Sequence, residues 1–215
     1  MKMKFKKYWR KTSLKNKKDG DFLLKQIEKS KPKNFLEIGV FHGVTSRNVC
    51  EILHLIHGDD FKFTGIDLFL DEKNRKTLKD EHLPKTTFSN PLKTIYYDFI
   101  IKSNPYNIES VNKLLKKFSK NINIIKGDSN EVLKKINLDK IDYVFLDGGH
   151  KYETVKNDLE NLTQIVNNNG IILCDDYDLS YAPGIKKAID EYVQNKNYNL
   201  KILNFRFAEI TKKIS

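Results

Sequence analysis

Three aspartates that follow two apolar runs in the second half of the chain could together bind a metal ion. The run Ile141–Leu146 ends at Asp147, and the run Ile171–Cys174 ends at Asp175 and Asp176. Such runs are typical of buried parallel strands. Three adjacent carboxylates repel one another unless a positive charge lies among them. An all-oxygen set suits a hard divalent ion such as Mg²⁺, Mn²⁺ or Ca²⁺, so we favour a metal site over the alternative of helix-capping or solvated aspartates.

The segment between the two runs explains why these aspartates should meet. Apolar residues recur at helical spacing from Tyr152 to Val166, and Asn168, Asn169 and Gly170 then end the predicted helix. A strand, a helix and a strand in this order form a right-handed crossover, which makes the two strands parallel. Their carboxyl ends should therefore be neighbours at the edge of the sheet where open α/β folds bind ligands.

The rest of the chain alternates strands and helices, which predicts a Rossmann-like, doubly wound α/β sheet, mostly parallel with a C-terminal antiparallel hairpin strand. The predicted helices cover Asp19–Ser30, 44–55, Ile108–Phe118, Glu131–Ile136 and 185–193. The further strands cover Asn34–Gly39, Phe61–Asp67 and Ile122–Lys126, and residues 199–210 predict the hairpin. Residues 68–105 do not fit this alternation. A connection of this length is either a lid over a binding site or a surface insertion without a function.

A glycine-containing turn, Gly39 to Gly43, joins the first predicted strand to the next helix. The glycines let a ligand approach the backbone, and the start of the helix presents free N–H groups. The pattern GxGxxG is absent, which disfavours a pyrophosphate cofactor. Asp67 ends the second strand 28 residues after Gly39, about where an acidic residue would bind ribose hydroxyls.

Composition and charge limit the class of protein. A chain of 215 residues suits one domain, and it contains no apolar run long enough to cross a membrane. Because residues near the N-terminus form no apolar run, we expect no signal peptide. Cys50 and Cys174 lie in apolar elements, so we expect reduced thiols and a cytoplasmic location. We divide the chain into a basic N-terminal arm, residues 1–18, and a domain, residues 19–215.

The formal net charge of +11 is concentrated near the N-terminus. Residues 1–33 contain 13 Lys and Arg against 3 Asp and Glu. Phe5, Tyr8 and Trp9 alternate with basic residues in the arm, a composition that could contact nucleic acid, anionic lipid or a phosphorylated acceptor. Because a charge run alone is weak evidence, we expect the arm to be a solvated tail.

Together these segments resemble the class I S-adenosylmethionine-dependent methyltransferases, from about Asn34 to Lys212. FLEIGVFHG is similar to the first motif of that family, and GIDLF, GDSNEVL, DYVFLDGGHKY and LCDD follow in the order of the family. Phe41 replaces the commoner middle glycine of the first motif, as an aromatic residue also does in the metal-dependent O-methyltransferases of the catechol type. The run from DDYD to PGIKKAIDEY is similar to macrocin-type sugar O-methyltransferases.

The resemblance implies a set of site residues. The methionine half of S-adenosylmethionine would lie against Glu37, Gly39, Val40, Gly43 and Thr45. Asp67 would bind the ribose, and Leu68, Asp128 and Ser129 would lie near the adenine. Mg²⁺ or Mn²⁺ would be held by Asp147, Asp175 and Asp176.

The catalytic step that the resemblance implies is methyl transfer to a hydroxyl of a sugar, a glycan or another small diol. The catechol-type enzymes have a lysine as the base three residues after the first metal aspartate, and His150 takes that place here. A histidine ordinarily exchanges its proton near neutral pH, so we assign His150 as the base, and we count the metal ligand Asp147 with it as a catalytic residue.

Two other functions remain open at this stage. A metal-dependent hydroxylase or hydrolase on the same fold would share the DGxH-Y segment, and a nucleic-acid methyltransferase could use the basic arm. We expect a small-molecule or glycan acceptor and no nucleic-acid partner. The arm allows peripheral contact with a membrane surface, and the sequence leaves homo-oligomers open.

Overall fold

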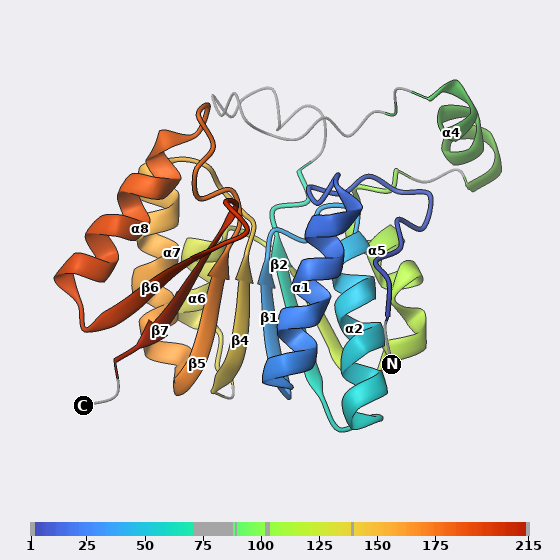
Figure 1. Ribbon diagram of the computed structural model, residues 1–215. Helices are drawn as coiled ribbons and strands as arrows, with labels where there is room; N and C mark the ends of the chain where they lie inside the picture. Colours follow the sequence, from blue (N-terminus) through green and yellow to red (C-terminus); the bar gives the residue numbers. More distant parts are fainter. Residues whose placement is uncertain (1–2, 71–87, 89, 102–103, 139, 214–215) are drawn as a thin grey trace.

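The computed structural model describes residues 3–70, 88, 90–101, 104–138 and 140–213, and these form a seven-stranded sheet with helices on both faces (Figure 1). The strand order is β3-β2-β1-β4-β5-β7-β6. The five parallel strands are β1 (Asn34–Ile38), β2 (Lys62–Asp67), β3 (Ile122–Lys126), β4 (Ile141–Leu146) and β5 (Val166–Cys174). The hairpin of β6 (Tyr198–Leu203) and β7 (Phe207–Lys212) adds the antiparallel pair. The predicted fold class is confirmed.

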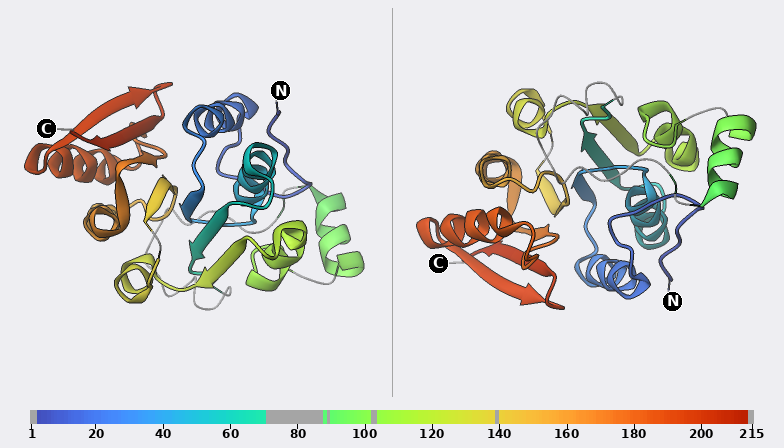
Figure 2. Two further views of the ribbon diagram at one scale, coloured as in Figure 1. Left: turned by 90° about the horizontal axis from the view of Figure 1, so that it is seen from below. Right: turned by 90° about the horizontal axis from the view of Figure 1, so that it is seen from above.

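Alternate residues of each central strand pack against different helices, because successive side chains of a strand point to opposite faces. Phe35, Tyr143 and Phe145 belong to a core cluster with buried residues of α1 (Lys17–Ser30), α2 (Val44–His57) and α5 (Ile108–Leu114). Leu36, Val144 and Leu146 belong to a second cluster with α6 (Ser129–Lys135), α7 (Tyr152–Ile165) and α8 (Pro183–Asn195). Figure 2 shows helices on either side of the sheet, in views from below and from above the orientation of Figure 1.

Parallel pairing places the carboxyl ends of β1, β4 and β5 side by side. Asp147 donates its backbone N–H to Ile38 O at 2.8 Å, and Asp175 donates its backbone N–H to Leu146 O at 2.9 Å. The first residues after β4 and β5 are therefore fixed beside each other and beside the end of β1. The predicted crossover is confirmed, and it explains why the aspartates converge.

The start of β5 differs from the prediction. Val166, which the periodicity placed in the helix, is extended with φ −80° and ψ 135° and pairs with Ile141. The next pair is Tyr143 with Ile171, so the register shifts over Asn167 to Gly170. The helix therefore ends at Ile165, and the residues expected to terminate it form an irregular part of the strand. Pairing with β4 outweighs the local helical periodicity.

The basic arm is not the solvated tail that its composition predicts. Phe5 is 3% exposed and Leu14 is fully buried. The Phe5 ring lies so close to α1 that a Cβ added to Gly20 would be 2.3 Å from its Cγ. Arg10 is also buried and donates to His42 O and Ser110 O at 3.0 Å. Lysines conceal this packing in the sequence, because the buried residues Phe5, Arg10 and Leu14 are separated by exposed Lys4, Lys6, Lys7 and Lys15.

Much of the predicted insertion lies outside the described residues, so its role as a lid stays a prediction. Its described part includes α4 (Pro91–Ile95) and the π-helix Tyr96–Ile101. Tyr97 is buried and stacks on Phe88 with ring centroids 4.9 Å apart. A 3₁₀ turn, Lys116–Phe118, follows α5. Among the described residues, no helix combines the length and apolar character needed to cross a bilayer.

The burial of Phe5 predicts that the arm contributes to stability. Phe5→Ala should lower the free energy of unfolding by about 3 kcal/mol, because it removes a buried aromatic ring and leaves a cavity beside Gly20. Urea unfolding measures this value, and Lys4→Ala, at an exposed neighbouring position, is the control. Equal unfolding free energies for the two variants would show that the arm is dispensable for the core.

Candidate functional site

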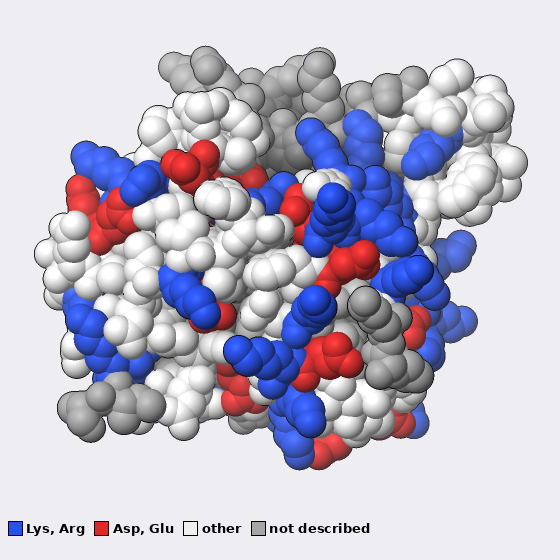
Figure 3. All heavy atoms as spheres, in the orientation of Figure 1, with Lys and Arg blue, Asp and Glu red and all other residues white. Residues whose placement is uncertain are grey.

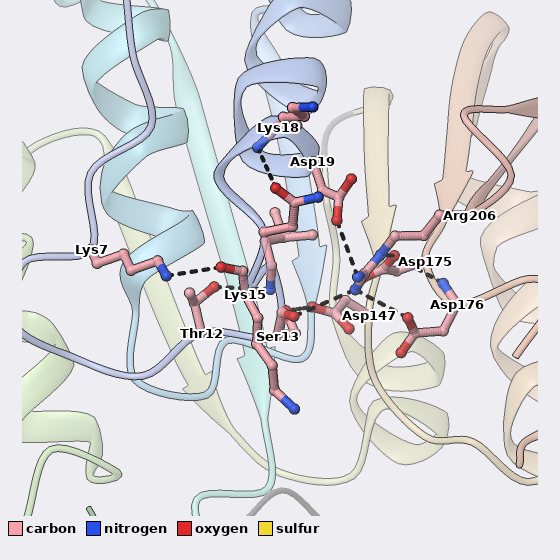
Figure 4. A network of polar contacts seen from close by, with 12 residues as sticks. Lys7, Thr12, Ser13, Lys15, Lys18, Asp19, Asp147, Asp175, Asp176 and Arg206 are labelled. Carbon is pink, nitrogen blue, oxygen red and sulfur yellow. Dashed lines mark hydrogen bonds and ion pairs between the residues drawn. The ribbon is translucent and has the colours of Figure 1, made fainter. Parts of the chain in front are cut away.

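The three predicted metal ligands lie together at the carboxyl edge of the sheet (Figure 4). One carboxylate oxygen from each of Asp147, Asp175 and Asp176 lies within 4.8 Å of the others. Asp175 and Asp176 are 3% and 8% exposed. Asp176 has a φ of 58°, a conformation that few residues other than glycine adopt. The expected convergence of the aspartates is confirmed.

Arg206 provides a positive charge that the sequence analysis did not anticipate. It lies in the turn of the β6–β7 hairpin and donates two hydrogen bonds to Asp175, from Nε at 2.5 Å and from Nη2 at 2.6 Å. Its Nη2 also lies 3.0 Å from Asp176 Oδ1. The guanidinium thus forms a bidentate pair with one carboxylate of the triad and contacts a second. The hairpin was predicted, but its pattern did not indicate which side chain its turn carries toward the triad.

Burial and the charges of neighbouring carboxylates raise the pKa of two members of the triad, Asp147 and Asp175. Burial raises the pKa of Asp175 to about 6, and the hydrogen bonds from Arg206 oppose that rise. Burial, and then the charges of the other two aspartates, raise the pKa of Asp147 well above its ordinary value. One guanidinium neutralises one of three carboxylates, which leaves two formal negative charges when all are ionised. The donor set and the remaining charge therefore fit a divalent cation with oxygen ligands.

His150, the predicted base, lies beside the triad. Its Nε2 is 3.4 Å from Asp176 Oδ2, and the loop that carries it follows β4. The hollow beside the triad is lined by Leu146, Asp147, Gly148, Gly149, His150, Val155, Cys174, Asp175, Asp176 and Ile185. The structure brings the predicted base and metal ligands together, and the role of His150 stays a prediction.

A second hollow lies next to the first and shares Asp147 with it. Its lining consists of Lys11, Thr12, Ser13, Gly39, Val40, Phe41, Val44, Thr45 and Asp147. It includes three of the residues that the resemblance assigns to the cofactor, Gly39, Val40 and Thr45. The contribution of the arm was not predicted, because no local pattern in residues 11–13 indicates a ligand site.

Gly39 is required by the close approach of two strand ends. It has a φ of +96°, and a Cβ at this position would lie 2.0 Å from Asp147 O. Gly43, with a φ of 73°, precedes α2 without a side-chain hydrogen bond to cap the helix. The first turn of α2 is therefore without a side-chain cap, and its N–H groups offer donors to an anionic group.

Glu37 lies under this turn with an unpaired oxygen. The residue is fully buried, and Oε2 accepts a hydrogen bond from the Ser46 hydroxyl. Oε1 has no hydrogen-bond partner among the described residues. Burial raises the pKa of Glu37 to about 8, although the bond from Ser46 opposes the rise. A buried acceptor without a donor is what a cationic ligand group would complete.

The other predicted cofactor residues lie outside the linings of both hollows, as far as the described residues show. Asp67 ends β2, and its carboxylate accepts hydrogen bonds from Phe41 N at 2.7 Å, Phe69 N at 2.9 Å and Tyr106 Oη at 2.9 Å. Asp67 thus organises the turn after β1 whether or not it binds ribose. Leu68 follows it. Asp128 caps α6 by accepting from Asn130 N at 2.9 Å, and Ser129 is the first residue of α6.

The buried state of Glu37 predicts a pH dependence of stability. Its carboxyl binds a proton up to about pH 8 in the folded chain but only to about its ordinary pKa of 4.5 when unfolded. The folded state therefore holds more protons in this window, and stability falls as pH rises through it. Glu37→Gln should remove this contribution and flatten the slope of unfolding free energy against pH relative to wild type. Parallel slopes would contradict the assignment.

Comparisons with known proteins agree with this arrangement. A family model described as a methyltransferase domain matches residues 36–177, well over half of the chain. No curated protein matches the chain in sequence. The solved structures that match include SAH-bound PaMTH1 of Podospora anserina, with 15% identity and a TM-score of 0.61 over 94% of this chain and 80% of that chain.

Two further solved structures extend the comparison. The O-methyltransferase NovP has 17% identity and a TM-score of 0.63, over 89% of this chain and 80% of that chain. The O-methyltransferase from Bacillus cereus in complex with SAH has 12% identity and a TM-score of 0.60, over 95% and 83% of the two chains. At these identities the likeness shows a shared fold. Together with the family match over residues 36–177, it places the chain in the methyltransferase-domain family, with the fold of the class I S-adenosylmethionine-dependent methyltransferases.

Proposed function

We propose that the chain is an S-adenosylmethionine-dependent O-methyltransferase that methylates a hydroxyl of a sugar, a glycan or another small diol with the help of a divalent metal. The observation that carries this proposal is that Asp147 lines both hollows. One hollow is lined by the turn after β1, and the other contains the aspartate triad. A methyl donor in the first and an acceptor oxygen in the second would be neighbours, which in-line transfer requires.

The chain has groups suited to the methionine and ribose parts of the cofactor. The unpaired Oε1 of Glu37 can accept from the ammonium of the methionine half. The uncapped start of α2 offers N–H groups to its carboxylate. Asp67 lies at the end of the neighbouring strand β2, the position that the resemblance assigns to the ribose hydroxyls. The structures of PaMTH1 and the Bacillus cereus enzyme contain SAH, which supports the same cofactor here.

The acceptor side combines the triad with His150. Asp147, Asp175 and Asp176 would hold a divalent ion, which when bound lowers the pKa of a nearby hydroxyl. His150 accepts the proton of that hydroxyl, and Asp176, 3.4 Å away, stabilises the protonated ring. The oxygen–methyl bond forms as the sulfur–methyl bond breaks, and the products are the methyl ether, S-adenosylhomocysteine and a proton on His150. A vicinal diol would present two oxygens to such a site.

The rival functions differ from the proposed one in the cofactor or in the acceptor. A hydroxylase or hydrolase would act without S-adenosylmethionine. A nucleic-acid methyltransferase would use the arm, but the burial of Phe5 and Arg10 commits part of that segment to the fold. We therefore retain a small-molecule or glycan acceptor, with a cytoplasmic location as part of the proposal.

An activity screen tests the proposed function. The chain is incubated with Mg²⁺ and S-adenosylmethionine labelled on the methyl group, together with sugar nucleotides, glycans and phenols. Transfer of label to a hydroxyl of one acceptor class supports the proposal. Turnover of an acceptor without consumption of S-adenosylmethionine would replace it with the hydroxylase or hydrolase alternative.

The acidic triad predicts that turnover requires a metal. A chelator should abolish methyl transfer, and Mg²⁺ or Mn²⁺ should restore it, because the ion stabilises the ionised acceptor. Asp176→Ala should weaken the binding of the ion, measured by calorimetry without cofactor or acceptor. Full activity in excess chelator would show that the triad serves the fold alone.

The position of His150 predicts a loss of rate without a loss of cofactor affinity. His150→Ala should lower the single-turnover rate of methyl transfer by about 10²–10⁴-fold, the usual contribution of a positioned base. The dissociation constant for S-adenosylmethionine should hardly change. Lys151→Ala, at the exposed neighbouring position, is the matched control. A variant that keeps the wild-type rate, or that simply loses the metal, would make His150 structural or a ligand.

A further inference from the structure

Arg206 occupies the region between the carboxylates that a metal ion would need. Its Nη2 bonds to Asp175 Oδ2 at 2.6 Å and lies 3.0 Å from Asp176 Oδ1, so it lies between two of the three ligands. The side chain is 21% exposed, while that of Asp175 is 1% exposed. An ion held by all three aspartates would have to approach the same two carboxylates, and two adjacent cations repel each other.

The same guanidinium reaches the N-terminal arm. Nη1 lies 3.5 Å from Asp19 Oδ2, and Nη2 lies 3.5 Å from Ser13 O (Figure 4). The Ser13 hydroxyl donates to Asp147 Oδ2 at 2.5 Å. Residues 13–19 are therefore connected to the triad in two ways, directly through Asp147 and indirectly through Arg206.

This part of the arm also borders the second hollow, which the proposed function assigns to the cofactor and which we call the cofactor hollow. Lys11, Thr12 and Ser13 line it opposite the turn after β1. Leu14 is fully buried beside them, and Asn16 caps α1 by accepting from Lys18 N. The contacts that hold residues 11–13 over the cofactor hollow thus include contacts with the groups that would bind metal.

We propose that Arg206 is the resident counter-cation of the aspartate triad, that it competes with the divalent ion, and that metal loading releases residues 11–13 of the arm from the second hollow. The inference rests on the metal site of the proposed function. With an ion held by the triad, Asp175 and Asp176 would no longer be available to Nη2 of Arg206, and Asp147 would no longer be available to the Ser13 hydroxyl. Both connections of the arm are then lost together. By linkage, metal binding and arm docking oppose each other to the same extent.

The first measurement is metal affinity without cofactor or acceptor. Arg206→Met keeps much of the side-chain length and removes the charge, so it should bind Mn²⁺ at least about 10-fold more tightly than wild type by calorimetry. Lys201→Met, at an exposed position on β6 of the same hairpin, is the charge-matched control and should leave the affinity unchanged. Unchanged or weaker Mn²⁺ binding by a folded Arg206→Met variant would overturn the competition.

The second measurement reports the arm itself. Trp9 is the single tryptophan of the chain, and its ring lies 5.9 Å from that of Tyr96. Mn²⁺ quenches fluorescence by itself, so Mg²⁺ is used for this titration. In wild type, Trp9 emission should change during the titration with a midpoint that matches the Mg²⁺ dissociation constant found by calorimetry. The change in emission should be smaller in Arg206→Met. Mg²⁺ binding without any change in Trp9 emission would overturn the release of the arm.

Two variants keep the test decisive if Arg206→Met does not fold. Arg206→Lys keeps the charge but loses the bidentate fork, and Ser13→Ala removes the direct bond to Asp147. Each should bind Mn²⁺ more tightly than wild type, and equal affinities would overturn the inference. Failure of every folded variant to bind a divalent ion would also overturn it, together with the metal of the proposed function. Labelled methyl transfer would then decide the remainder of that function separately.

Discussion

The rest of the site depends on the repulsion among three carboxylates that the sheet forces together. Backbone bonds from Asp147 to Ile38 and from Asp175 to Leu146 continue the parallel pairing beyond the strands, so the main chain holds the acids side by side. Burial strengthens the repulsion because little water remains to screen it. The guanidinium of Arg206 and the hydroxyl of Ser13 reduce this repulsion by donating hydrogen bonds to Asp175 and Asp147. Both come from segments that are far away in the sequence.

The central strands also explain why the two hollows are adjacent. The ends of β1 and β4 approach so closely that the position of Gly39 has no room for a Cβ beside Asp147 O. The turn that lines the cofactor hollow and the first acid of the triad are therefore in direct backbone contact. In the proposed transfer reaction, the ends of β1 and β4 would therefore set the separation of donor and acceptor.

The N-terminal arm combines basic side chains on the surface with apolar side chains in the core. Lys and Arg side chains gather on the surface around the arm and α1 (Figure 3), while Phe5 and Leu14 face the core. Arg10 joins the arm to the turn after β1 and to α5 through His42 O and Ser110 O. The arm is thus part of the domain against which it packs, and its basic composition does not by itself indicate a partner.

The sequence by itself determined the alternation of strands and helices, the order of the motifs and the place of the acids at strand ends. These follow from local period and residue type, so a contiguous stretch such as Ile141–Asp147 contains the information. Only the tertiary structure decided that Arg206 neutralises Asp175, 31 positions away, and that Ser13 bonds to Asp147, 134 positions away. It also decided that β5 begins at Val166, because pairing with Ile141 outweighs helical spacing. Contacts between distant residues leave no periodic signal in either partner, and their energy exists only once the sheet has brought the partners together.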